Sequence, residues 1–325
     1  MIRFFGDNRP LVLFFLPLVL LGFHIAFHLS VMPTGPLHID FGWWGNVTIK
    51  NGNGMLSYEI LAGSWVLLNA ILSSYTFNSS ELNEKNTYLP ALNFVVLSAI
   101  SINFYQFNGL HLASTALLLG IYQCLQLNQN QDGASRIFNT GFFIGIAATV
   151  YPAFVVLIPF GILLYLIFRP FLVREFYLYA LGCAIPFLYL ISRSYLFDLS
   201  YPNYSFDWND FIRDFNLNHA INLAIILCVF IVSLLGVMRK LATAGNRVKK
   251  ELQLINTMGI GILTALLFCV FLAKPALKME FFIVPLSFLF TFPLLSKRLS
   301  FASSFLFYLF LLFGLLKFTF LNQLQ

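Results

Sequence analysis

The chain has 325 residues, of which 59% are hydrophobic and only 10% are charged. Soluble domains are roughly 45–50% apolar, so this composition and the mean hydropathy of +0.82 exclude an ordinary soluble fold and predict an integral membrane protein. The net charge of +6 comes from basic residues spread over loop ends rather than gathered in one patch. This spread argues against a nucleic-acid partner.

The first apolar run, residues 11–27, follows Arg3 and Arg9. It is longer than the apolar region of a typical secretory signal peptide, and no small-residue cleavage site follows it at 30–33. We therefore expect the run to be a retained first helix.

Apolar segments of membrane-spanning length alternate with short polar gaps along the rest of the chain. A spanning helix needs about 20 residues. The stretch 137–168 is too long for one crossing, and Pro152 offers a break because proline removes a helix hydrogen bond and crowds the preceding turn. With that break we predict eleven spans, at 11–29, 57–76, 88–104, 109–127, 137–150, 152–168, 175–193, 219–238, 255–273, 279–295 and 301–320.

Loop charge orients these spans. Cytoplasmic loops carry an excess of Lys and Arg. An inside N-terminus with eleven spans places 13 of the 19 basic residues on the inner side, including the basic loop 239–250. Without the break at Pro152 the basic residues divide almost evenly. We therefore predict an all-α, multi-pass membrane protein, with the N-terminus inside and the C-terminus outside.

The whole chain, 1–325, is predicted to be a single transmembrane domain with two longer outer loops, near 30–56 and 194–218. The first contains the interface-anchoring sequence Phe41-Gly42-Trp43-Trp44 and a turn signal at Asn51-Gly52-Asn53-Gly54. In the second, an apolar i, i+3, i+4, i+7 pattern from Trp208 to Phe215 predicts a short helix on the outer membrane surface. The four cysteines all fall inside apolar segments and are expected to be small core residues.

Polar residues converge on the outer ends of the predicted helices. They comprise all five histidines, several acids and three basic residues, namely His24, His28, His38, Asp40, Glu59, His111, Arg193, Asp198, His219, Lys274, Lys278 and Glu280. Ionisable groups beside a span are costly and commonly mark a functional cavity. We therefore look for a site at this end, and no cofactor is required for it.

Each candidate also has a plainer interpretation. Asp40 is either a solvated loop carboxylate or a general base at the membrane surface. Glu59, expected in the first turn of its helix, suits the helix dipole there. His24 and His28 have the i, i+4 spacing of metal ligands, but the sequence specifies no third ligand, so no metal site is predicted.

The cations Arg193, Lys274 and Lys278 are either snorkelling residues at helix ends or ligands for an anionic head group such as a lipid phosphate. The inner basic loop 239–250 is explained by topology alone.

This pattern resembles the C-type glycosyltransferases, which are polytopic enzymes with an inside N-terminus. The resemblance rests on Asp40 in the first outer loop, on the proline-broken middle helices from Phe142 through Pro152 to Pro159, and on the amphipathic loop 194–218. It covers architecture more than residues: Asp40 is single where these enzymes often carry an acidic pair, the first loop is short, and no large outer C-terminal domain follows. The Phe/Asn/Leu-rich style also resembles an uncharacterised inner-membrane family of Bacteroidota.

The resemblance implies sugar transfer from a polyprenyl-phosphate donor at the outer face of the cell envelope. In that scheme Asp40 is the base or activating carboxylate, while Arg193, Lys274 and Lys278 hold the donor phosphate. Glu59 and His111 position the acceptor or donor. Two alternatives remain open: a non-catalytic membrane subunit or scaffold of an envelope complex, and a transporter, which the absence of a mid-span acid and of a visible repeat disfavours.

Overall fold

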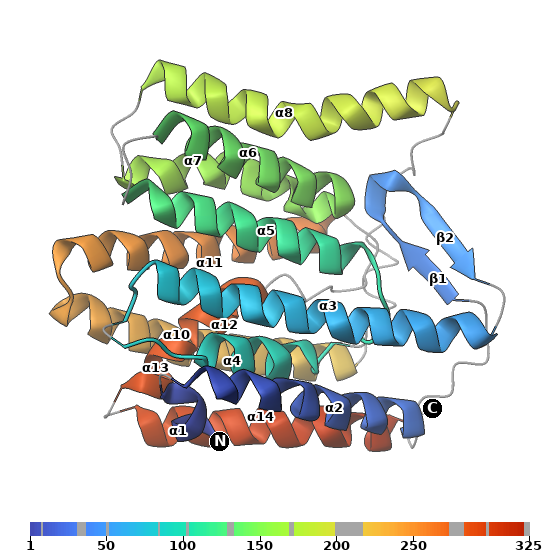
Figure 1. Cartoon of the computed structure of the whole chain (residues 1–325), viewed down its shortest axis with the longest axis vertical. Helices are drawn as coiled ribbons and strands as arrows, with labels where there is room; N and C mark the ends of the chain where they lie inside the picture. Colours follow the sequence, from blue (N-terminus) through green and yellow to red (C-terminus); the bar gives the residue numbers. More distant parts are fainter. Residues whose placement is uncertain are drawn as a thin grey trace.

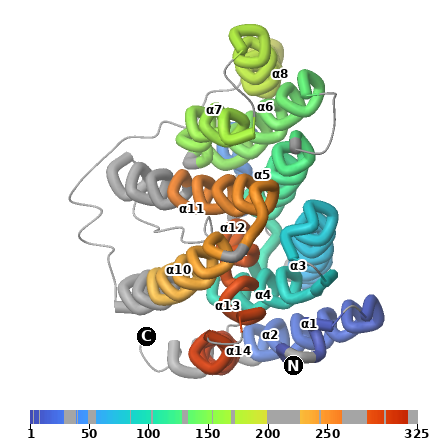
Figure 2. Tube along the Cα trace, turned by 90° about the vertical axis from the view of Figure 1, so that its left-hand side faces the viewer, coloured from blue at the N-terminus to red at the C-terminus, as the bar shows by residue number. Residues whose placement is uncertain are grey.

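The computed structural model consists of roughly parallel and antiparallel helices stacked side by side. Helix α8 lies at one end of the stack and α14 with α2 at the other, with the remaining helices between them (Figures 1 and 2). The structure describes residues 1–7, 9–30, 37–49, 52–83, 85–101, 104–128, 133–168, 172–198, 217–272, 283–296 and 299–321. Among these residues the only sheet is a two-stranded hairpin.

The first half of the chain supplies one face of the stack and the hairpin. Its elements are α1 (Ile2–Gly6), η1 (Pro10–Phe15), α2 (Leu16–Ser30), β1 (Leu37–Asp40), η2 (Gly42–Trp44), β2 (Asn46–Ile49), α3 (Gly52–Ser79), α4 (Leu89–Ser98), α5 (Gly109–Leu125) and η4 (Gln126–Asn128). The second half comprises α6 (Gly133–Val150), η5 (Pro152–Val156), α7 (Leu157–Phe168), α8 (Val173–Leu196), α10 (Leu217–Thr243), α11 (Asn246–Leu272), α12 (Ile283–Leu289), α13 (Thr291–Leu295) and α14 (Ser300–Leu321).

Three of the described helical segments are long and apolar enough to cross a membrane, namely Pro10–His28, Leu56–Ser79 and Val173–Leu196. Large apolar side chains remain exposed on such helices, for example Phe14 and Tyr195, which are 76% and 85% exposed. An exposed apolar surface of this kind fits a lipid environment. The prediction that the chain is helical and compatible with a membrane is therefore confirmed.

The break predicted at Pro152 is present. Helix α6 ends at Val150, the short helix η5 begins at Pro152, and α7 continues only from Leu157. Other predicted spans are shorter than expected: α4 has 10 residues, and α12 and α13 are separated at Phe290.

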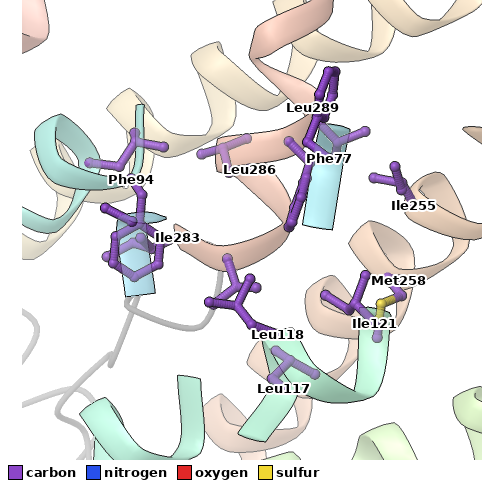
Figure 3. Close-up of a cluster of buried hydrophobic side chains, with 14 of the residues drawn as sticks. Phe77, Phe94, Leu117, Leu118, Ile121, Ile255, Met258, Ile283, Leu286 and Leu289 are labelled. Carbon is purple, nitrogen blue, oxygen red and sulfur yellow. The ribbon is translucent and has the colours of Figure 1, made fainter. Parts of the chain in front are cut away.

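The centre of the stack is an apolar cluster around α12. Side chains from α3, α4, α5 and α11 meet there, including Phe77, Phe94, Leu118, Ile255 and Leu286 (Figure 3). Beside this cluster the buried Asn93 amide donates to the Ser287 carbonyl, 3.3 Å away, and to the Thr291 hydroxyl, 3.1 Å away. Asn93 of α4 thus supports the chain where α12 and α13 are interrupted, a point at which helix hydrogen bonds are missing.

Glycines bring α6 and α8 into direct backbone contact. A Cβ at Gly141 would overlap the carbonyl oxygen of Tyr179, and one at Gly182 would overlap that of Phe138. A Cβ at Gly145 would lie 2.7 Å from the Cys183 carbonyl. Gly141 and Gly145 form the small-xxx-small spacing that lets membrane helices approach closely, so this pair of helices depends on glycine at the crossing.

Two loops predicted to lie on the inner side meet at one end of the stack. Arg247 at the start of α11 pairs with Glu81, which follows α3, at 3.0 Å. The hairpin lies at the opposite end of the helices (Figure 1). The inner and outer ends assigned from loop charge therefore correspond to two opposite ends of the structure.

The first outer loop differs from its prediction. It was expected to run to residue 56 with a turn at Asn51–Gly54, but Gly52 and Gly54 belong to α3. Part of the loop is the β-hairpin, which the all-helical assignment did not include. As a result Glu59 lies beyond the first turn of α3, so the helix-dipole explanation for this acid is wrong.

Candidate functional site

Asp40 is the last residue of strand β1. The two strands are antiparallel, with Leu37 opposite Ile49 and Asp40 opposite Asn46. The turn between them is closed by the Phe41 amide, which donates to the Gly45 carbonyl at 3.1 Å. The backbone of Asp40 is therefore held in a hairpin and does not belong to an open loop.

The hairpin turn is anchored on the ends of α6 and α8. Gly42 has a φ of +63°, and a Cβ there would overlap the Val150 carbonyl oxygen. Only glycine suits such a backbone and such an approach. From α8, the Arg193 guanidinium donates from Nη1 to the Trp44 carbonyl at 3.0 Å and lies 5.5 Å from the centre of the Trp44 ring. Arg193 therefore fixes the turn that follows Asp40.

Aromatic contacts add to this anchorage. Trp43 meets Phe187 edge-on, and Trp44 stacks on Tyr189, with ring centroids 5.5 Å and 5.6 Å apart. Both partners belong to α8, so the second half of this helix forms a platform for the turn. Aromatic pairs at such distances each contribute about 0.5–1.5 kcal/mol beyond simple burial.

Glu59 is buried at the junction of α2 and α3. Its carboxylate lies 3.5 Å from Nδ1 of His28, and the residue is 8% exposed. His24, one turn earlier on α2, instead packs against Gly63 and against the ring of Tyr105. The two histidines therefore have different partners, and no group of three potential metal ligands occurs among the described residues.

His111 is fully buried at the third position of α5 and forms part of the N-terminal cap of that helix. The side-chain oxygen of Asn108 accepts a hydrogen bond from the Leu110 backbone amide at 3.0 Å, and the backbone amide of Asn108 donates to Nδ1 of the His111 ring at 3.3 Å. Such a capping box satisfies amides that the first helical turn leaves without partners. The ring also contacts Phe104 and Phe107, so His111 has a structural role at this end.

A buried polar chain between α3 and α5 was missed by the sequence analysis. The Trp65 indole donates to the Thr115 hydroxyl at 2.8 Å, and that hydroxyl lies 2.7 Å from Oδ1 of Asn69. The Asn69 amide in turn donates to the His111 carbonyl at 3.3 Å. The available signal was Asn69 itself, because a polar amide inside an apolar span needs a buried partner.

A small cavity of about 10 Å³ lies between α2, α3 and the end of α4. His24, Ser98 and Tyr105 line it together with apolar side chains. This space holds about one water molecule. Burial raises the pKa of the Tyr105 phenol, so its hydroxyl stays protonated and donates to the Ala99 carbonyl at 3.2 Å.

The predicted site residues whose side chains the structure describes lie at three places. Arg193 lies at the hairpin turn, Glu59 lies with His28 at the α2–α3 junction, and His111 lies at the start of α5. Of Asp40 the structure describes the backbone alone. Lys274, Lys278 and the predicted surface helix from Trp208 to Phe215 lie outside the described residues.

Comparison with curated proteins and with solved structures found no match. A family model does match, over residues 44–291. The match begins within the hairpin turn and extends to the start of α13, so it covers most of the helical stack and more than half of the chain. The chain therefore belongs to the family of unknown function DUF6427.

Proposed function

We propose that this protein is a multi-pass enzyme of the bacterial inner membrane, similar to the C-type glycosyltransferases, that transfers a sugar from a polyprenyl-phosphate donor at the outer face. In the proposed reaction an acceptor hydroxyl gives its proton to the Asp40 carboxylate and attacks the anomeric carbon. The bond from that carbon to the phosphate oxygen breaks, and polyprenyl phosphate leaves.

The observation that carries this proposal is the anchored hairpin. A general base contributes only when it is held within hydrogen-bond reach of the proton that it removes. Gly42 against Val150 and Arg193 on Trp44 fix the turn next to Asp40. A solvated loop carboxylate needs no such anchorage, so the packing favours a catalytic role over the plainer interpretation.

Arg193 retains the capacity for a second partner. Its guanidinium has five N–H donors, and the structure assigns one of them to the Trp44 carbonyl. We propose that other donors of the same group bind the donor phosphate, together with Lys274 and Lys278. Glu59, at the α2–α3 junction, and His111, at the start of α5, would then position the acceptor or donor.

The proposed membrane placement has eleven spans, an inside N-terminus and an outside C-terminus. It is supported by the separation of the two ends of the stack: α1 and the α10–α11 turn lie at one end, and the hairpin and the last residues of α14 at the other (Figure 1). Reporter fusions after Gly245 and after Gln325 should therefore report opposite sides of the membrane. Two fusions reporting the same side would rule out eleven spans.

Transfer itself is tested with purified protein in lipid nanodiscs. Undecaprenyl-phosphate-linked sugars are supplied together with an envelope extract as the source of acceptors, and released undecaprenyl phosphate is measured by mass spectrometry. We expect release from at least one donor that depends on both protein and extract. If none of the supplied undecaprenyl-phosphate-linked sugars is bound or consumed, the glycosyltransferase assignment is wrong.

A non-catalytic membrane subunit is the second candidate, and one observation favours it. Within the part of the chain that the structure describes, the cavity beside His24 and Tyr105 holds only about one water molecule, whereas ligand pockets usually have volumes of about 300–1,000 Å³. On this alternative the hairpin is a docking element for an envelope complex. The protein would then retain its cellular function when Asp40 is replaced by alanine, because the backbone pairing of the hairpin does not depend on that carboxylate.

A further inference from the structure

We propose that the end of the α10–α11 helical hairpin binds the headgroups of anionic phospholipids on the side of the membrane at which it lies, predicted to be the inner side. The binding surface consists of Arg239, Lys249 and Lys250, with Leu235 and Met238 beside them. This proposal needs the membrane placement of the helices but not the proposed sugar transfer.

The two helices are long enough to reach the headgroup layer. Helices α10 and α11 each have 27 residues, which corresponds to about 40 Å. The hydrocarbon core of a bilayer is about 30 Å thick. The turn that joins the helices protrudes beyond the neighbouring ends of α3 and α5 (Figure 1). The surplus length therefore lies at the end that carries the basic residues.

Two of the five basic residues at this end are used within the protein. Arg247 lies 3.0 Å from Glu81 and 3.4 Å from Glu251, so it joins the segment after α3 to α11. Lys240 donates to the side chain of Asn83 at 3.5 Å. Glu251 is fully buried, and a buried carboxylate needs a nearby cation. These contacts hold the α10–α11 hairpin in place.

The other three basic residues face outward. Arg239 and Lys250 are exposed and Lys249 is partly exposed. Among the described residues, no ion pair involves any of the three. Each lies within about 6 Å, measured along the helix axis, of the turn between the helices. The α10–α11 turn has five basic residues, and the two acids that pair with Arg247 are Glu81 and Glu251, so a surplus of three positive charges remains around this turn.

Apolar residues beside this charge identify the partner as a lipid. Leu235 and Met238 are 48% and 65% exposed, and they share a helix face with Arg239 at i, i+3 and i+4 spacing. The acyl chain of a phospholipid can lie along Leu235 and Met238, while the headgroup phosphate of the same lipid contacts Arg239. A soluble anion or an acidic peptide would use the charges but not the apolar strip. Basic clusters immediately beside membrane helices are known to attract anionic headgroups.

The test is a lipid titration followed by native mass spectrometry. Cardiolipin and phosphatidylglycerol are added to the detergent-solubilised full chain and compared with phosphatidylcholine. Each basic residue near an anionic membrane surface strengthens lipid binding, and removing three of them should weaken the affinity for anionic lipid about 100-fold. We therefore expect the triple variant Arg239→Gln, Lys249→Gln, Lys250→Gln to lose anionic lipid while it keeps its unfolding temperature.

The matched control is Arg247→Gln, which removes one basic residue from the same turn. Because Arg247 pairs with Glu81 and Glu251, this change should lower the unfolding temperature, and below that temperature it should weaken lipid binding by less than about 10-fold, against about 100-fold for the triple variant. The proposal fails if the triple variant binds cardiolipin as well as the parent does. It also fails if inorganic phosphate at millimolar concentration displaces the lipid, because the site would then be one for soluble anions.

Discussion

Replacing Gly182 with alanine should destabilise the protein, because the added methyl group forces α8 away from α6. The new Cβ would overlap the Phe138 carbonyl oxygen and lie 2.9 Å from the Phe142 amide nitrogen. Both obstacles are backbone atoms of α6, so no side chain can rotate away. Overpacking of this kind costs about 1–3 kcal/mol. Helix α8 packs mainly against α6 and has few other helical neighbours that could compensate for the loss.

Thermal unfolding of the purified protein in detergent measures this effect, with Gly22→Ala as the matched control. Gly22 is an exposed helical glycine, and a Cβ there would meet nothing within 4 Å. Its replacement should be neutral, or stabilising by up to about 1 kcal/mol, because alanine favours helix. Equal unfolding midpoints for the two variants would show that α6 and α8 do not cross at these glycines.

Asp40→Asn should abolish the proposed transfer while the protein still folds. Asparagine keeps the size of the side chain but cannot accept the acceptor proton, and loss of a general base typically lowers the rate by 10²–10⁴-fold. The backbone pairing of Asp40 with Asn46 does not depend on the carboxylate. Turnover in the nanodisc assay, together with complementation of a deletion strain, would measure the loss.

Asp7→Asn provides the control for charge alone, because Asp7 is an exposed aspartate just after α1, at the opposite end of the helices. The Asp7→Asn variant should have normal activity.

Gly42→Ala tests the anchorage separately: Asp40 remains, but the turn can no longer approach Val150. Normal activity in Asp40→Asn and Asp40→Ala would remove this carboxylate from the reaction, and with it the main argument for catalysis.

Several features could be predicted from the sequence because they depend on local chemistry. Apolar segments of the necessary length mark helices, since the peptide groups of a chain in lipid must bond within the segment. The break at Pro152 follows from the missing proline amide. The uneven distribution of basic residues separated two ends, and residues assigned to the same end do meet, as Glu81 with Arg247 and Trp44 with Arg193 do.

Tertiary packing decided the rest. The hairpin around Asp40 is short and rests on Val150 and Arg193, contacts more than a hundred residues away in sequence that no local pattern reveals. Likewise, the spacing of His24 and His28 placed them on one face, but only the position of α3 gives Glu59 to one and Gly63 to the other. Sequence determines which groups are costly to bury in a membrane, whereas the packing of distant helices determines which partner each of them finds.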